Sequence, residues 1–138
     1  MKRIRERGRI LIVDDEERIC SLLAKRLGMD NYSCIVANTS KEALHHFYKN
    51  QFSLVICDVK IPQMDGLELL RTMKAFDPDM MMIMMTGYPD IDIVIKAMRM
   101  GAHDFLVKPF DLESMVSSVR TILEEKGLQQ KVDLAINT

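Results

Sequence analysis

Five short apolar runs recur along the chain, and each is followed by a segment in which apolar residues return every three or four positions. The runs occupy residues 10–13, 34–37, 54–57, 81–85 and 105–107. Near-continuous apolar runs of this length are typical of strands that are buried on both faces, as in a parallel sheet. The segments between them have the spacing of amphipathic helices. The pattern therefore predicts five strand–helix units.

Residues at the expected helix ends support this division. Thr39 with Glu42 and Asp65 with Glu68 have the spacing of a capping box, and Asp111 is a favourable N-cap for the last helix. Three glycines stand where helices are expected to stop, namely Gly28, Gly101 and Gly127. Because strands and helices alternate, we predict an α/β fold, a doubly wound (βα)₅ domain with five parallel strands and helices on both faces.

The length of 138 residues suits one domain. We place that domain at residues 10–126, after a basic N-terminal arm at 1–9 and before a C-terminal tail or the start of a linker at 127–138. In this tail Leu128, Val132 and Ala135 have helical spacing. We therefore expect a short helix there, separated from the last helix of the domain by Gly127.

Charge and hydropathy exclude several classes of protein. The 19 basic and 20 acidic residues give a formal net charge of -1, which argues against a globally basic nucleic-acid binder. The arm carries Lys2, Arg3, Arg5, Arg7 and Arg9, which we interpret as a solvated terminus. No apolar run approaches the ~20 residues that span a bilayer, and the N-terminus turns acidic too early for a signal peptide. We expect a cytoplasmic protein without membrane contact.

Sulfur-containing residues are interpreted as core residues. Cys20, Cys34 and Cys57 lack CxxC spacing, and each lies in an apolar stretch, as expected of reduced thiols in a cytosolic protein. Five methionines lie within residues 80–85. Because alternate strand residues face opposite sides of a sheet, their sulfur atoms cannot converge on one soft metal ion.

Polar side chains follow the apolar runs at the point where each predicted strand ends. In chain order they are Asp14, Asp15 and Glu16, then Asn38 and Thr39, then Asp58, then Thr86 with Gly87, and finally Lys108 with Pro109. In open parallel sheets the functional site lies beyond the carboxyl ends of the strands. We therefore expect three acids, a hydroxyl and an amine to converge on one edge of the sheet.

Clustered carboxylates repel one another and need a cation at neutral pH. A set of oxygen ligands favours Mg²⁺ or Mn²⁺ over zinc. Asp15 and Asp58 suit direct ligation, and Asp14 suits ligation through water. One carboxylate can also attack phosphorus to give an aspartyl phosphate, and the metal, Lys108 and Thr86 would then stabilise the charge on the phosphoryl oxygens.

Four stretches carry a family resemblance, ILIVDDEE, LVICDVKIPQMDGLELL, IMMTGYPD and GAHDFLVKPFD, which lie within residues 10–125. In order and spacing the chain resembles the receiver domain of bacterial two-component response regulators. The resemblance implies a flavodoxin-like receiver fold with strand order 2-1-3-4-5. The segment KAMRMGAHDFLVKPF most resembles receivers of transcriptional activators.

The resemblance also implies a role for each residue of the acidic site. Asp58 would be the phosphoacceptor and would take the phosphoryl group from a sensor histidine kinase or a phosphotransfer protein. Asp14 and Asp15 would form the acidic pair for Mg²⁺, together with Asp58 and the backbone carbonyl of Lys60.

Four further residues receive roles from the same resemblance. Thr86 and Lys108 would bind the phosphoryl group. Thr86 would also be the switch hydroxyl, and Phe105 would be the switch aromatic. The peptide bond between Lys108 and Pro109 would be cis, a form largely confined to bonds that precede proline.

The function that these features predict is a phosphorylation-activated signalling receiver. Phosphorylation would change the surface formed by the fourth helix, the fifth strand and the fifth helix. This surface would control an output domain, for example a transcriptional one, or a partner such as a second copy of the chain. We expect no enzyme activity beyond self-phosphorylation and auto-dephosphorylation, and no nucleic-acid binding by this domain itself.

Three alternatives stay open. The chain can be a stand-alone phosphorelay or interaction receiver. A phosphatase with an aspartate nucleophile is disfavoured, because Lys60 stands where haloacid-dehalogenase phosphatases carry a second acid. A flavin or nucleotide binder at the strand ends is disfavoured, because Asp14, Asp15 and Glu16 would repel phosphate unless a metal were bound.

Overall fold

Strands and helices alternate along the chain in the computed structural model, within the residues that it describes, 7–88 and 90–137. The strands are β1 (Gly8–Val13), β2 (Tyr32–Ala37), β3 (Leu54–Asp58), β4 (Met82–Thr86) and β5 (Asp104–Val107). The helices are α1 (Glu17–Gly28), α2 (Ser40–Lys49), α3 (Gly66–Phe76), α4 (Ile91–Arg99) and α5 (Leu112–Ile136). The five predicted strand–helix units are therefore confirmed.

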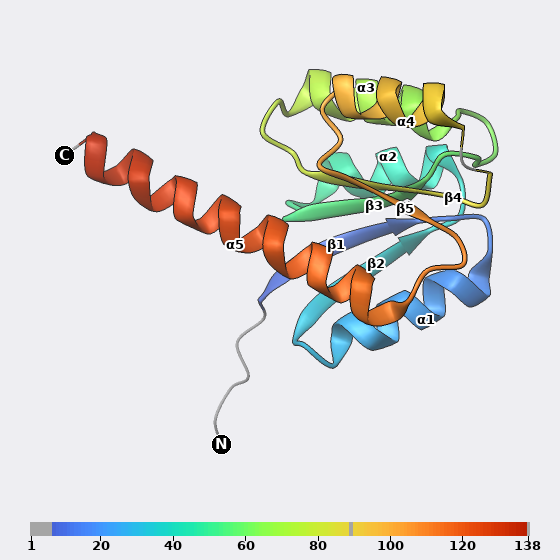
Figure 1. Ribbon diagram of the computed structural model, residues 1–138, viewed down its shortest axis with the longest axis horizontal. Helices are drawn as coiled ribbons and strands as arrows, with labels where there is room; N and C mark the ends of the chain where they lie inside the picture. Colours follow the sequence, from blue (N-terminus) through green and yellow to red (C-terminus); the bar gives the residue numbers. More distant parts are fainter. Residues whose placement is uncertain (1–6, 89, 138) are drawn as a thin grey trace.

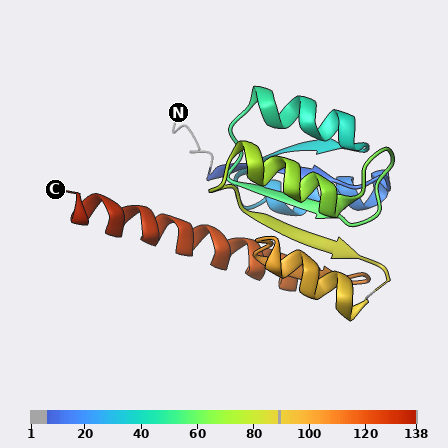
Figure 2. The same ribbon diagram turned by 90° about the horizontal axis from the view of Figure 1, so that it is seen from above.

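The strands form one parallel sheet in the order β2-β1-β3-β4-β5. Helices α1 and α5 pack against one face, and α2, α3 and α4 against the other (Figures 1 and 2). This arrangement is the doubly wound α/β fold that the sequence pattern predicts, with the strand order that the family resemblance implies. It places the carboxyl ends of β1, β3, β4 and β5 along one edge of the sheet.

Burial of the sheet on both faces explains the unbroken apolar runs. In β1, Leu11 and Val13 belong to the core beneath α2 and α3, whereas Ile10 and Ile12 belong to the core beneath α1 and α5. The methionines divide in the same way. Met80, Met82 and Met84 pack on the first side, and Met81 and Met85 pack on the second. The methionines therefore fill both cores, as predicted.

Capping interactions fix where the helices begin. Thr39 accepts a hydrogen bond from the backbone N–H of Glu42 (3.1 Å), and Asp65 accepts one from Glu68 (2.9 Å). Helix α4 stops before Gly101, whose φ of 102° lies in the left-handed region that favours glycine. The predicted stop at Gly28 also holds, because Gly28 is the last residue of α1.

The predicted stop at Gly127 is wrong. Helix α5 continues through this glycine to Ile136 and projects beyond the sheet as one straight helix (Figure 1). A glycine inside a helix costs only about 1 kcal/mol relative to alanine, and the residues on either side, Lys126 and Leu128, are good helix formers. The projecting part exposes the apolar residues Leu128, Val132, Leu134 and Ile136.

The cysteines are unpaired thiols, with Cys20 and Cys57 buried and Cys34 half-buried. Of the predicted basic arm, residues 1–6 lie outside the described part of the chain, and Arg9 already belongs to β1. Among the described residues, no helix is long and apolar enough to cross a membrane.

Candidate functional site at the carboxyl edge of the sheet

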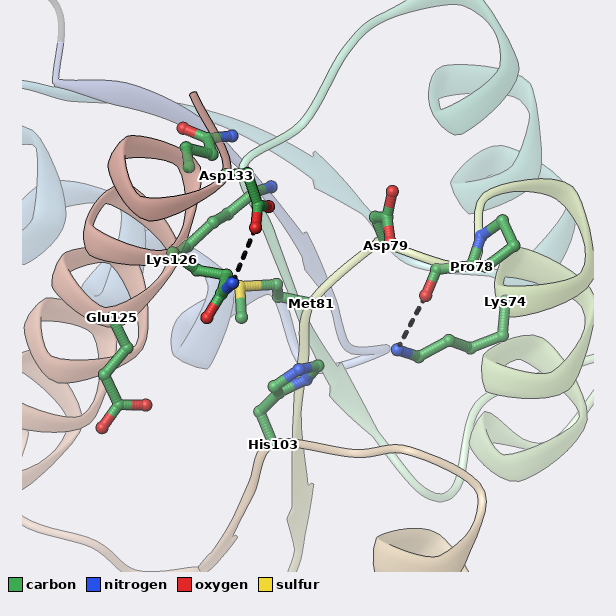
Figure 3. A pocket seen from close by; sticks show the side chains of 10 residues that line it. Lys74, Pro78, Asp79, Met81, His103, Glu125, Lys126 and Asp133 are labelled. Carbon is green, nitrogen blue, oxygen red and sulfur yellow. Dashed lines mark hydrogen bonds between the residues drawn. The ribbon is translucent and has the colours of Figure 1, made fainter. Parts of the chain in front are cut away.

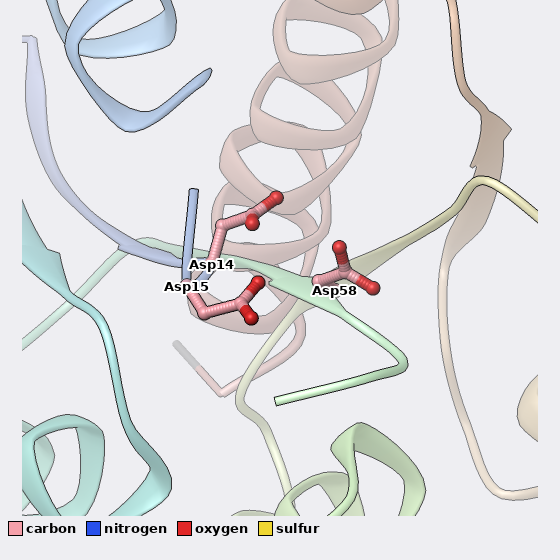
Figure 4. Close-up of side chains that lie close together, drawn as sticks. All are labelled: Asp14, Asp15 and Asp58. Atoms are coloured by element: carbon pink, nitrogen blue, oxygen red, sulfur yellow. The ribbon is translucent and has the colours of Figure 1, made fainter. Parts of the chain in front are cut away.

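Three carboxylates meet where β1 and β3 end. One oxygen from each of Asp14, Asp15 and Asp58 lies within 4.8 Å of the others (Figure 4). Asp14 and Asp58 are buried, whereas Asp15 is exposed to solvent. The cluster forms because β1 and β3 are neighbours in register, with Val13 beside Cys57, so the residues that follow them emerge side by side.

Local hydrogen bonds hold the two buried carboxylates. Asp14 Oδ1 accepts from the backbone N–H of Glu16 (2.9 Å), and Asp58 Oδ1 accepts from the backbone N–H of Lys60 (2.9 Å). The side chain of Asn38, at the end of β2, donates to the backbone carbonyl of Asp14 (2.9 Å). These contacts engage only Oδ1 of each carboxylate, and Oδ2 of both residues faces the ammonium group of Lys108.

Lys108 bridges the buried carboxylates from the end of β5. Its Nζ lies 2.6 Å from Asp14 Oδ2 and 2.5 Å from Asp58 Oδ2. The backbone N–H of Lys108 donates to the carbonyl of Thr86 (2.7 Å), which ties the ends of β4 and β5 together. The peptide bond between Lys108 and Pro109 is cis.

The ionisation of the site reflects burial and pairing together. Burial raises the pKa of Asp14 above 3.8, and the nearby charge of Asp58 raises it further. The hydrogen bonds from Lys108 and from the Glu16 N–H lower this pKa but do not outweigh burial. Burial opposes the charge of Lys108, but its hydrogen bonds to Asp14 and Asp58 and their charges raise its pKa above the ordinary 10.5. Lys108 therefore stays protonated at neutral pH.

The charge of the cluster fits a divalent cation. Three carboxylates face one ammonium group, so two negative charges remain uncompensated when all three acids are ionised. The available ligands are oxygens, and the exposed carboxylate of Asp15 leaves the cluster accessible from solvent. Hard cations such as Mg²⁺ prefer this kind of site.

Thr86 and Phe105 lie on the two strands beyond β3. Thr86 is buried, and its hydroxyl accepts a hydrogen bond from the N–H of Tyr88 (3.1 Å) and lies 3.3 Å from the Tyr88 carbonyl. Phe105 is half-buried and packs against the core beneath α2, α3 and α4, next to Met84 in the β4–β5 register. In this structure the Thr86 hydroxyl is thus bonded within its own loop.

Two contacts of the site have no clear counterpart in the sequence-based predictions. The Lys60 ammonium lies 4.4 Å from the centroid of the Tyr88 ring, which joins the loops that follow β3 and β4. A Cβ atom at Gly66 would lie 2.3 Å from the carbonyl oxygen of Asp58. The signal for the second contact is a glycine in the first turn of a helix, where a better helix former is expected.

A groove of about 510 Å³ opens beside Lys108. Its walls come from α1 and from the loops that follow β4 and β5, and they include Ile19, Leu22, Pro109, Phe110 and Leu112. Leu22 is 52% exposed although it is a large apolar residue. The acidic site is therefore flanked by an apolar surface that a protein can contact.

Comparisons with known proteins agree on one family. The response regulator receiver domain family matches residues 10–120. The chain is 32% identical over 125 residues to the regulatory protein AtoC of Escherichia coli strain K12, a match that covers 91% of this chain and 27% of AtoC. The chain thus spans about a quarter of the length of this relative.

Solved receiver structures have the same fold. A CheY-like receiver domain protein from Methanospirillum hungatei JF-1 is 30% identical, with a TM-score of 0.84, over 88% of this chain and 97% of that one. The beryllofluoride-activated NtrC4 receiver domain, solved as a dimer, is 35% identical, with a TM-score of 0.81, over 85% of this chain and 97% of that one. With the family match, the strand order and the acidic cluster in agreement, the chain belongs to the response regulator receiver domains of two-component signalling systems.

Proposed function

We propose that this receiver is switched by phosphorylation of Asp58, with the phosphoryl group supplied by a sensor histidine kinase or a phosphotransfer protein in the cytoplasm. The observation that carries the proposal is the buried carboxylate of Asp58, held beside Asp14 and Asp15 and bonded to Lys108. In this proposal the receiver spans residues 10–126. Residues 127–138 form a tail or the start of a linker toward an output domain, for example one that controls transcription.

The residues of the site have complementary tasks in this transfer. One carboxylate oxygen of Asp58 forms a bond to phosphorus while the bond between phosphorus and the donor nitrogen breaks, and the electron pair stays on that nitrogen. Lys108 already lies against Asp58 and offers its ammonium to the negative phosphoryl oxygens. The hydrogen bonds from the Lys60 N–H and from Lys108 hold the Asp58 carboxylate in one orientation before the donor arrives.

A divalent cation, Mg²⁺ or Mn²⁺, would neutralise charge on the carboxylates and on the phosphoryl oxygens. Asp15, Asp58 and the backbone carbonyl of Lys60 would hold it directly, and Asp14 would hold it through water. The oxygen-only cluster and its two uncompensated negative charges support this assignment.

The donor protein docks on the groove beside Lys108. This surface adjoins the acidic site, and it combines an exposed leucine, Leu22, with the apolar side chains of Ile19 and Phe110. Burial of such residues supplies association free energy, at roughly 25 cal/mol per Å² of apolar surface. The groove therefore gives a kinase or phosphotransfer protein a place to bind while its histidine faces Asp58.

The readout passes through Thr86 and Phe105. A phosphoryl group on Asp58 adds acceptor oxygens that draw the Thr86 hydroxyl away from the Tyr88 backbone, and the half-buried Phe105 turns into the space left behind. The surface of α4, β5 and α5 then changes. Ile91, Ile95, Met98 and Val107 are exposed on it, which suits an output domain or a second copy of the chain.

The first experiment tests the phosphoacceptor. With acetyl phosphate and Mg²⁺, intact-mass measurement should show one added phosphoryl group on the wild type. The addition should be lost in Asp58→Asn and without divalent metal. The matched control is Asp77→Asn, an exposed aspartate at the end of α3, which should label like the wild type. Undiminished labelling of Asp58→Asn would overturn the assignment.

A second experiment tests the switch. Beryllofluoride, which stands in for the phosphoryl group, should perturb the NMR signals of Thr86, Phe105 and the helix α4. Thr86→Ala should still be phosphorylated at Asp58 but should transmit less of that change. A response confined to the neighbours of Asp58 would contradict the readout while leaving the acceptor chemistry intact.

A further inference from the structure

A second cavity lies at the opposite edge of the sheet, where β1 and β3 begin. Its volume is about 570 Å³, and it is bounded by the start of β1, the segment before β3 and the middle of α5. Three cationic side chains line it, from Arg7, Arg9 and Lys126. Three neutral polar side chains, from Gln51, Ser53 and Gln130, complete its hydrogen-bonding groups.

Among the described residues that line this cavity none carries a carboxylate, although the chain has slightly more acidic than basic residues. Within residues 7–88 and 90–137, neither Arg7, Arg9 nor Lys126 has an acidic side chain within 4.0 Å. Three positive charges therefore face one hollow without internal compensation. Such an excess attracts anions from solution.

Both arginines are held in place. Arg9 donates from Nη1 to the side-chain carbonyl of Asn50 (3.0 Å), and the Arg7 guanidinium lies 5.2 Å from the centroid of the Tyr32 ring. Between them, Gly8 allows close packing, since a Cβ atom there would lie 2.9 Å from the Ser53 hydroxyl oxygen. Less side-chain freedom is then lost when a ligand binds.

The neighbouring cavity on the other side of α5 differs in charge (Figure 3). It has a volume of about 470 Å³, and it contains Lys74, His103 and Lys126 together with the acidic residues Asp79, Glu125 and Asp133. Its positive charges therefore have acidic groups on the same walls. This contrast singles out the cavity at the start of β1 as the one suited to an anion.

We propose that the cavity lined by Arg7, Arg9 and Lys126 binds a small anion that carries two phosphate groups, either free or as part of a nucleotide. Guanidinium groups bind phosphate oxygens in paired hydrogen bonds, and three cations match a ligand with two or more negative charges. A volume of about 570 Å³ lies within the range of small-molecule sites. Phe52 and Leu123 on its walls provide apolar surface for an organic part.

This site is separate from the acidic site in place and in chemistry. It lies where the strands begin, whereas Asp14 and Asp58 lie where they end. Binding therefore needs neither a metal ion nor Asp58. The same ligand without a metal would be repelled by the carboxylates at the other edge.

Calorimetric titration of the 138-residue chain in EDTA tests the proposal, with inorganic pyrophosphate, inorganic phosphate and adenosine diphosphate as probes. Pyrophosphate should bind more tightly than phosphate. Arg9→Gln and Lys126→Gln should each weaken binding about tenfold or more, as expected for a lost hydrogen bond between charged groups. The matched control is Lys131→Gln, an exposed lysine on the same helix, which should stay within about twofold of the wild type.

The arms of the titration distinguish the source of the ligand. Tighter binding of adenosine diphosphate than of pyrophosphate would assign the cavity to a nucleotide, and equal affinity would assign it to the free diphosphate. Asp58→Asn should bind as well as the wild type, which separates this result from any failure of the phosphorylation site.

Three results would overturn the proposal. One is the absence of binding by every probe. Another is equal affinity of pyrophosphate for the wild type and for Lys126→Gln. Lys126 is half-exposed, and the melting temperature of the variant shows whether it is folded. The third is tight binding of a single-stranded oligonucleotide with no saturable binding of pyrophosphate.

Discussion

The two edges of the sheet carry opposite charge. At the carboxyl edge, Asp14, Asp15 and Asp58 meet a single lysine. At the amino edge, Arg7, Arg9 and Lys126 line a cavity, and no acid is found among the described residues of its walls. In a doubly wound fold the helices begin near the first edge, so the acidic residues lie on the side of the helix N-termini, whose partial charge is positive. The net charge of -1 conceals this division.

The difference shows how much the surroundings decide what a charged cluster does. The buried acids are bonded to backbone N–H groups, and the cluster leaves a deficit of two positive charges. The cations line an open hollow, where an amide and an aromatic ring orient the two arginines. The first arrangement suits a compact divalent cation, and the second suits a larger anion.

The largest expected effect is a loss of stability at the acidic edge when Gly66 is replaced by alanine. Gly66→Ala places a Cβ atom 2.3 Å from the Asp58 carbonyl oxygen and 2.9 Å from the Val59 Cα, both of which are backbone atoms. The loop that holds Asp58 must then shift, at a cost of about 3 kcal/mol. Urea unfolding should show this loss, and acetyl phosphate labelling should fall with it. Wild-type stability and labelling would show that the loop yields freely.

The next largest effect is the gain in folding stability on addition of Mg²⁺, which should depend on the acidic edge alone. At a concentration about 30 times its dissociation constant, Mg²⁺ should add about 2 kcal/mol to the free energy of unfolding, because it binds only the folded cluster. Asp15→Ala should remove most of this gain, and Arg9→Gln at the other edge should keep it. A melting temperature that is indifferent to millimolar Mg²⁺ would count against the metal site.

Sequence reasoning located the acidic edge because each of its side chains directly follows an apolar run. An apolar run is enough to predict where a strand ends. Parallel pairing of β1 with β3 then brings Asp14 and Asp58, which follow these runs, close together. The basic edge had no such marker. Arg7 and Arg9 resembled a solvated terminus, and only the tertiary packing of α5 across the start of β1 brings Lys126 to the same cavity.

Contacts between loops were equally hidden from the sequence. Lys60 follows Asp58 and Tyr88 follows Thr86 by two residues, which places both near the acidic site. The direct contact between the Lys60 ammonium and the Tyr88 ring depends on the conformation of the two loops. The same holds for Gly66, whose close approach to Asp58 follows from how α3 begins. Periodicity predicts elements and their ends, and tertiary packing decides which of those ends touch.

A smaller effect concerns the cost of the buried acid. Burial raises the pKa of Asp14 above 3.8, so the folded chain holds this proton more tightly than the unfolded chain. The Asp14 carboxyl group therefore contributes most to the free energy of unfolding at low pH, where it is protonated. This contribution is lost as the pH rises through the raised pKa of Asp14 in the folded chain.

Without metal, Asp14→Asn should consequently be more stable than the wild type near pH 7. The gain should shrink as the pH falls below ~4, because the wild-type carboxyl is then increasingly protonated in the unfolded chain as well as in the folded one. Urea unfolding at several pH values in EDTA measures it. Asp15→Asn is the matched control, because its side chain is exposed and should bring no comparable gain. A variant less stable than the wild type at pH 7 would mean that the pair with Lys108 outweighs burial.

The smallest expected effect sharpens the comparison from the basic edge. Gly127 borders the cationic cavity and lies inside α5, and a Cβ atom added there would meet no other heavy atom within 4 Å. Gly127→Ala should therefore stabilise the helix by about 0.5 to 1 kcal/mol, since alanine loses less backbone freedom. Thermal unfolding by circular dichroism measures the gain, and labelling at Asp58 should not change. A loss of stability would show that α5 needs the glycine as a flexible point between the receiver and the residues that follow.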